Sequence, residues 1–285
     1  MLERAWLAEH FEFHPLDLED VMSRNQRPKL DEYPDYLFIL LHFPIFDKQV
    51  GRLNAGELDM FVGPDYVITL PNQPLKPIEY LFERCRTNEE VREQYFSKGP
   101  GYLLYHIVDQ AFDYCFPMLR KIGNKLEQLE EDIFSGRGED VVRDISNVKQ
   151  EIINFRKIIR PERTVLRDLE RTKQRFLTDE ELEFYFDDIV DASERIWDML
   201  ENYKEVVEAL EDTNESVISH RVNDVLRVLT AFSVIVLPLT FVASLWGMNV
   251  GVPWEHEMVG FWILTGAMIG ILVGMVSYFR HRGWL

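Results

Sequence analysis

The sequence predicts an acidic α+β region, then a very long helix that enters a two-helix membrane hairpin. No ionisable side chain occurs from Val228 to Trp254, and no charged side chain from Val259 to Phe279. A bilayer core about 30 Å thick requires roughly 20 apolar residues of a helix. The 285-residue chain has a formal net charge of −18, and most of its charges lie before Val228. The alternative is a helical hairpin buried in a soluble core, but such helices seldom stay uncharged for this long.

Residues 1–115 show alternating strand and helix patterns, and we expect an α/β domain there. The run YLFILLHFPIF is rich in β-formers, and GELDMFVGPDYVITLPN indicates a strand, a turn at Gly63–Asp65 and a second strand. These strand patterns lie at 36–46 and 56–72. Two shorter patterns, at 14–22 and 75–85, are typical of short helices.

Long helices are predicted for most of the remaining chain. Patterns at 100–134 and 140–172, separated by SGRG, favour an antiparallel pair. A third helix is expected to begin near Thr178, a good N-cap residue before three acids. It has no glycine before its end near 246, so it would be on the order of 100 Å long. We assign 116–227 to this long-helix and stalk region.

The third helix carries an apolar seam at heptad spacing, which predicts packing on the 100–172 helices. A neighbouring strip is acidic at first and becomes small and hydroxylic in the apolar part. Several parallel copies would make this strip the wall of a water-filled passage, whereas facing lipid would be unfavourable. Tight helix packing, with hydroxyls bonded to their own helix, is the alternative. The candidate pore-lining residues are Asn223, Leu226, Thr230, Ser233, Leu237, Thr240 and Ser244.

Charge flanking the spans predicts a multi-pass protein of the cell (inner or plasma) membrane with both termini in the cytoplasm. Arg221 and Arg227 precede the first span, Arg280 and Arg282 follow the second, and the connecting segment has no Lys or Arg. No signal-peptide pattern occurs at the N-terminus. The two cysteines are therefore expected to be reduced. The expected segments are span 228–249, outer loop 250–258, span 259–279 and basic tail 280–285.

Several function classes are disfavoured. The acidic charge argues against nucleic-acid binding, and no nucleotide-binding motif is present. The seven histidines are scattered without metal-ligand spacing, and His106 with Asp109 forms at most a weak pair. We therefore expect no catalytic residues, no covalent cofactor and no enzymatic activity.

The residues 223–249, NDVLRVLTAFSVIVLPLTFVASLWGMN, resemble the CorA family of divalent-cation transport proteins. The resemblance rests on Pro-Leu-Thr-Phe, then Gly-Met-Asn, one short loop and a last span ending in YFRHRGWL. HPLDLEDV, QRPKLDEYPDYLFILLHF and YLLYHIVD are also similar to the family's cytosolic domain, so the likeness covers nearly the whole chain. It implies a homopentameric funnel in which stalk helices line a central pore for Mg²⁺, driven by the membrane potential.

The resemblance also implies site residues. Asn223, Leu226, Thr230, Leu237 and Thr240 match family pore positions. Gly247, Met248 and Asn249 match the selectivity filter, where uncharged oxygens would accept hydrogen bonds from the water around a hydrated Mg²⁺. Glu255 and Glu257 would concentrate cations at the outer mouth.

In the family, Mg²⁺ bound between neighbouring cytosolic domains holds the pore closed. One acid comes from the LED helix and the other from the stalk, and these positions match Asp20 and Asp188. Losing the ion would leave like charges facing each other across the subunit interface.

Two alternatives stay open. The loop VPWEHEM departs from the family's Met-Pro-Glu-Leu, and imidazole at His256 suits Zn²⁺ or Ni²⁺ better than Mg²⁺. A Zn²⁺, Co²⁺ or Ni²⁺ transporter of the same fold is thus the first alternative. A membrane-anchored coiled-coil scaffold is the second, although a scaffold has no use for the polar strip.

Overall fold

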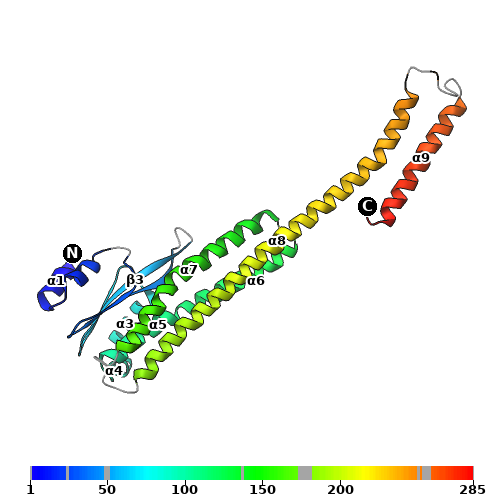
Figure 1. Cartoon of the computed structure of the whole chain (residues 1–285). Helices are drawn as coiled ribbons and strands as arrows, with labels where there is room; N and C mark the ends of the chain where they lie inside the picture. The colour runs from blue at the N-terminus through cyan, green and yellow to red at the C-terminus, as the bar shows by residue number, and fades with distance from the viewer. Residues whose placement is uncertain are drawn as a thin grey trace. The chain divides into compact units, whose positions relative to one another are not determined.

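The computed structural model describes residues 2–23, 26–47, 52–135, 138–172, 182–248, 251 and 258–284. The chain divides into two compact units, Met1–Glu211 and Asp212–Leu285. Its elements are α1 (Leu2–His10), α2 (Pro15–Asp20), β1 (Lys29–Glu32), β2 (Leu37–Asp47), β3 (Arg52–Val62), β4 (Val67–Pro71), α3 (Lys76–Thr87), α4 (Glu89–Phe96), α5 (Pro100–Asp113), α6 (Cys115–Ser135), α7 (Gly138–Thr172), α8 (Leu182–Trp246) and α9 (Met258–His281) (Figure 1).

The first unit contains an antiparallel four-stranded sheet in the order β1-β2-β3-β4. The β2–β3 pair runs from Leu37 opposite Val62 to Asp47 opposite Arg52. Residues Leu37 to Leu41 are all buried, so β2 is covered on both faces. Helix α7 packs across β1, β2 and β3. Leu7, Phe13, Leu18 and Tyr36 form a cluster with β-strand aromatics.

Glycines allow two close approaches in this unit. A Cβ on Gly56 of β3 would lie 2.2 Å from Ile45 Cδ1. A Cβ on Gly123 of α6 would lie 2.8 Å from the hydroxyl of Tyr203 on α8. Real Cβ atoms do not approach other atoms this closely, so glycine lets the β2–β3 pair and the α6–α8 pair pack at these points.

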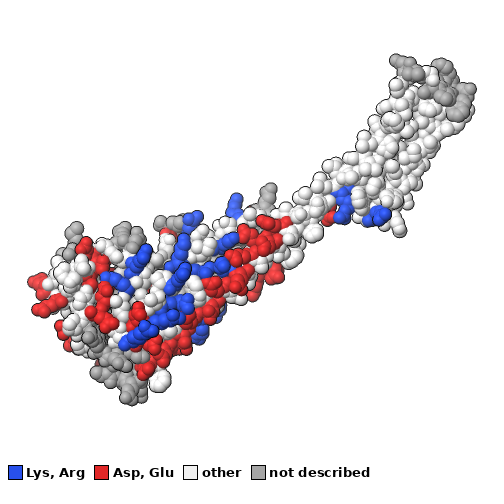
Figure 2. All heavy atoms as spheres, in the orientation of Figure 1, with Lys and Arg blue, Asp and Glu red and all other residues white. Residues whose placement is uncertain are grey.

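Helix α8 lies against α7 through a series of ion pairs, which we call the α7–α8 ladder. Lys149 pairs with Glu211 at 2.5 Å, Arg156 pairs with Glu201, and both Arg163 and Arg167 pair with Glu194. The guanidinium groups of Arg156 and Arg163 also lie 5.1 and 5.0 Å from the ring centroid of Trp197. Figure 2 shows the basic and acidic side chains running side by side along these helices. Such cation–π contacts add to the ion pairs.

The predicted packing of α8 on the first unit's helices is confirmed, with one shift in register. The predicted seam includes Ile189, Ala192, Ile196, Val206 and Leu210, and all of these except Val206 are buried. Val206 is 37% exposed, however, and Val207 is fully buried in its place. An ideal helix drifts about 20° per heptad, so a strict seven-residue repeat does not stay on one face.

In the second unit, α8 and α9 contain the two apolar segments. Their most apolar 18-residue windows have mean hydropathies of 2.3 and 2.2, and only 11% and 6% of each window is buried. A hairpin in a soluble core would be mostly buried, so the structure favours membrane spans. Ala231, Ile235 and Phe279 join the two helices in a small core.

The fold class predicted from the sequence is confirmed in its α+β domain, long helix and apolar helix pair. One run predicted as continuous, 100–134, is instead divided at Tyr114 into α5 and α6. Helices α1 and α4 and strand β1 were not predicted. The N-cap expected at Thr178 lies outside the described residues. Both cysteines are free thiols; Cys85 is partly exposed and Cys115 is buried.

Candidate ion pathway

The polar strip predicted from the sequence lies on the surface of α8. All seven candidate pore-lining residues from Asn223 to Ser244 are exposed. Toward the N-terminus of α8 the row continues with the exposed acids Asp212, at the start of the second unit, and Glu205 and Asp198 in the first unit. The two leucines of the strip, Leu226 and Leu237, are 51% and 67% exposed.

Three hydroxyls in the strip donate to their own helix. Thr230 Oγ1 donates to the Leu226 carbonyl at 2.7 Å, and Thr240 Oγ1 donates to the Val236 carbonyl at 2.8 Å. Ser233 bonds its helix in the same way at 3.0 Å. The hydroxyl proton is thereby used, and each oxygen keeps a lone pair that points away from the helix as an acceptor. The strip consequently presents acceptors, which suit a cation or the hydrogens of its water.

The predicted filter begins where α8 ends. Gly247 N donates to the Ala243 carbonyl at 3.0 Å, and Met248 N donates to the Leu245 carbonyl at 3.4 Å. A Cβ on Gly247 would approach only backbone oxygens, the nearest at 3.4 Å, which is ordinary contact. The single chain therefore tolerates a side chain here, and any need for glycine must come from other copies. Asn249, Glu255 and Glu257 lie outside the described residues.

Asp20, one predicted regulatory acid, closes helix α2 and already has a cationic partner. Lys29 Nζ lies 2.7 Å from Asp20 Oδ2 and 2.5 Å from Asp31 Oδ2. Burial disfavours the charged amine, but the two carboxylates outweigh this effect and raise the pKa of Lys29. Lys29 thus holds the Asp20 carboxylate in place and neutralises part of its charge.

Asp188, the other predicted regulatory acid, is exposed on α8 and lies near a second acid of α5. Burial, together with the nearby charges of Asp113 and Asp188, raises the pKa of Asp109 to about 6. These carboxylates repel one another, and a divalent cation would relieve that repulsion with oxygen ligands of the type Mg²⁺ prefers. The chain itself does not join Asp20 to Asp188 by any contact between described residues, and none of its described His, Cys, Asp and Glu side chains form a ready group of three for a metal.

Two further carboxylates, Asp59 and Glu162, are buried in the first unit. Asp59 on β3 is 1% exposed, and burial with the neighbouring charges of Glu57 and Asp20 raises its pKa to about 7. Glu162 on α7 accepts a hydrogen bond from His42 N at 2.7 Å, and burial raises the pKa of Glu162 well above its ordinary value. One carboxylate oxygen of each acid has no partner among the described residues.

His106 and Asp109 were expected to be at most a weak pair on a solvated helix face. His106 is instead half-buried among the rings of Tyr95, Tyr102 and Tyr105, with centroids 4.4, 4.4 and 4.9 Å away. Burial lowers its pKa. Sequence reasoning did not connect Asp109 to Asp188 or Lys29 to Asp20, because each pair comes from different elements. For Asp109 and Asp188, the sequence showed only that acids recur within segments predicted to be helical.

A mixed α/β domain, one unbroken helix that becomes apolar, and a polar strip on that helix together define a membrane transport protein of the helical-stalk type. Comparison with known proteins supports this class. The chain is 31% identical over 280 residues to the cobalt/magnesium transport protein CorA of Thermotoga maritima, covering 98% of this chain and 79% of that protein. It is 22% identical to the zinc transport protein ZntB of Yersinia enterocolitica, covering 99% and 84%.

The solved CorA magnesium transporter of Methanocaldococcus jannaschii has the same fold, with a TM-score of 0.86, 24% identity and coverage of 99% of this chain and 88% of that one. The family model described as CorA-like Mg²⁺ transporter protein matches residues 2–281. The chain belongs to this family of divalent-cation transporters, as the resemblance predicted.

Proposed function

We propose that the chain assembles as a parallel homopentamer in the cell membrane and conducts Mg²⁺ through a passage lined by its α8 helices. The observation that carries the proposal is the exposed strip on α8, which stays polar through an apolar segment. Facing lipid, such a strip would be unfavourable. Facing an axis shared by several copies, it supplies acceptor oxygens at Thr230, Ser233 and Thr240.

The membrane potential would drive this transport. One charge crossing 100 mV gains about 2.3 kcal/mol, so a divalent cation gains about 4.6 kcal/mol. Rings of Leu226 and Leu237 would form apolar collars along the passage and could stop conduction by excluding water.

Selection would occur where α8 ends. Asn249 side chains and Gly247 carbonyls would accept hydrogen bonds from the water shell, so Mg²⁺ would not need to lose its tightly held waters. None of these groups is charged, which keeps binding weak enough for release. Glu255 and Glu257 would raise the cation concentration at the entrance.

Cytosolic Mg²⁺ would close the passage by binding between Asp20 of one subunit and Asp188 of the next. Burial raises the pKa of Asp109, and the nearby charges of Asp113 and Asp188 add to this effect, which supports a concentration of negative charge around Asp188. Without a cation, this charge on one subunit would repel Asp20 of its neighbour and push the subunits apart.

Cysteine accessibility tests the passage itself. In a Cys85→Ser background, Thr240→Cys should react with a charged, membrane-impermeant thiol reagent, and the reaction should block Mg²⁺ uptake into liposomes containing a Mg²⁺-sensitive dye. The matched control is Phe241→Cys, one residue further on and 64% exposed, which should face lipid and stay unlabelled. Equal labelling at both positions would refute the proposed passage.

Two further variants test the filter and the regulatory site. Asn249→Ala should reduce Mg²⁺ uptake at least tenfold, whereas Asn124→Ala on the exposed surface of α6 should not.

The double variant Asp20→Ala, Asp188→Ala should keep conducting when Mg²⁺ is added to the cytosolic side. If that variant were shut off like the wild type, the regulatory assignment would be wrong.

A Zn²⁺ transporter of the same fold is the second candidate, supported by the likeness to ZntB and by His256 in the predicted outer loop. Imidazole is a better ligand for Zn²⁺ than for Mg²⁺. Parallel liposome assays with Mg²⁺, Co²⁺, Ni²⁺ and Zn²⁺ dyes, with and without an imposed voltage, would rank the ions. His256→Ala should lower only Zn²⁺ or Ni²⁺ uptake.

A further inference from the structure

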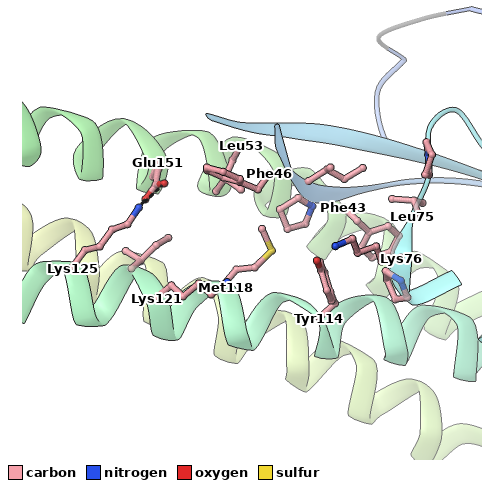
Figure 3. A pocket seen from close by; sticks show the side chains of 15 residues that line it. Phe43, Phe46, Leu53, Leu75, Lys76, Tyr114, Met118, Lys121, Lys125 and Glu151 are labelled. Carbon is pink, nitrogen blue, oxygen red and sulfur yellow. Dashed lines mark hydrogen bonds and ion pairs between the residues drawn. The ribbon is translucent and has the colours of Figure 1, made fainter. Parts of the chain in front are cut away.

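The first unit contains a cavity of about 570 Å³ that lies apart from the ion pathway. Strand β2, the loop before α3, and helices α6 and α7 surround it (Figure 3). Its size falls within the roughly 300–1,000 Å³ of small-molecule sites. All of its lining residues belong to the same compact unit, so the cavity is complete within one chain.

The floor of this cavity is apolar. Phe43, Leu53, Leu75 and Ile122 are each 5% exposed or less and form part of the core. Phe46 at one end is 46% exposed, although it is a large aromatic side chain. Burying such exposed apolar surface under a ligand is favourable.

The rim is basic, which is unusual in a chain with a net charge of −18. Lys76 comes from the first turn of α3, and Lys121 and Lys125 come from α6. Lys125 Nζ lies 2.8 and 2.6 Å from the two carboxylate oxygens of Glu151, so its charge is neutralised. Within the described residues, Lys76 and Lys121 have no ion pair. Figure 3 shows Lys76 reaching toward the cavity beside Tyr114.

We propose that this cavity binds an amphiphilic carboxylate, with its hydrocarbon chain on the apolar floor and its carboxylate held by Lys76 and Lys121. The charge pattern favours one anionic head group, because two ammonium groups remain available after Lys125 pairs with Glu151. The floor offers no polar side chain to recognise a base or a sugar, which argues against a nucleotide. A free acid of medium chain length satisfies both parts of the site.

The chain-length dependence of binding tests the proposal. The full chain in lipid nanodiscs is titrated by calorimetry with octanoate, decanoate and dodecanoate. Each added methylene that reaches the floor should tighten binding about fourfold until the cavity is full, as expected from the transfer of a CH₂ group out of water. An alcohol of equal length should bind at least tenfold more weakly than the carboxylate.

Variants separate the site from partitioning into the lipid. The double variant Lys76→Ala, Lys121→Ala changes only exposed residues and should no longer show saturable heat of binding in the titration. Lys157→Ala, which changes an exposed lysine on α7 away from the cavity, should still show it. Replacing both lysines by arginine should preserve binding. Met118→Trp, which fills the cavity and keeps the charges, should also abolish binding. Identical titrations of wild type and the lysine double variant, or equal affinity for the alcohol, would overturn the proposal.

Discussion

Helix α8 runs through both units, but its polar side chains have different surroundings in each. In the first unit, three acids of α8 pair with bases of α7 in the α7–α8 ladder, and most of its apolar seam is buried. In the second unit, the strip of α8 is exposed, and Thr230, Ser233 and Thr240 donate hydrogen bonds to carbonyls of their own helix. Figure 2 shows the contrast, with charges along the first part of α8 and nearly none along its apolar part. Packing within one chain therefore covers the seam of α8 in the first half, whereas the strip in the second half stays exposed.

The largest expected difference between the two halves concerns leucines. Leu200 is fully buried on α8, and Leu200→Ala should lower the free energy of unfolding of the first unit by about 2–5 kcal/mol. Leu237 is 67% exposed, and Leu237→Ala should change this free energy of unfolding by less than about 0.5 kcal/mol. Denaturant-dependent labelling of the buried Cys115 measures both. Similar losses for the two variants would contradict the comparison.

The buried carboxylates are an exception within the first unit, and their effect should be a few kcal/mol. The pKa of Asp59 is raised to about 7, so its folded form binds a proton that the unfolded form has released above about pH 4. Stability should therefore be greatest below pH 4 and should fall by about 1.4 kcal/mol per pH unit up to about pH 7 for this group. Asp59→Asn should remove this component from unfolding curves followed by circular dichroism, whereas Asp144→Asn on the exposed face of α7 should not.

The α7–α8 ladder should contribute less. Burial opposes ionisation of Glu194, but hydrogen bonds from Arg163 and Arg167 outweigh it and lower the pKa of Glu194. Its contribution is thus present above the ordinary glutamate pKa near 4.3 and is lost as the pH falls through the lower folded value. Glu194→Gln should cost about 0.5–1 kcal/mol at pH 7, and the cost should shrink as the pH falls below the ordinary glutamate pKa. Exposed Asp198→Asn is the control, and a pH-independent loss would count against the ladder.

The smallest stability effect is expected for the strip itself. Thr240→Val should alter unfolding by less than about 0.5 kcal/mol, because its hydroxyl bonds only its own helix. Mg²⁺ uptake should nevertheless fall several-fold, because valine removes an acceptor from the passage, and Thr240→Ser should restore it. Unchanged uptake in the valine variant would place this face outside the passage.

Periodic and strongly apolar segments were the parts that sequence could predict. Strands β2 to β4, helix α7 and both apolar helices follow from local composition. Strand β1 could not be predicted, because three of its four residues are charged and it is held by pairing with β2. The bond between Lys29 and Asp20 depends on β1 and α2 being brought together by the fold.

The candidate site divides in the same way. The strip could be read from a seven-residue repeat, since one helix fixes the relative directions of its side chains. The proximity of Asp188 to Asp109 depends on two helices meeting, and the proposed joint role of Asp20 and Asp188 would involve two subunits. Asn249, Glu255 and Glu257 stay predictions, as do the filter and the regulatory site.

The α7–α8 ladder restricts the ways in which α8 can move. Three of its acids, spread along more than four turns, are each held by bases on α7, and Trp197 is clamped between two of those bases. Spinning α8 about its own long axis would break all of these contacts at once, whereas tilting α7 and α8 as one beam breaks none. We therefore expect the proposed passage to open by a joint tilt of α7 and α8, so a cross-link between these two helices should leave Mg²⁺-dependent closure intact.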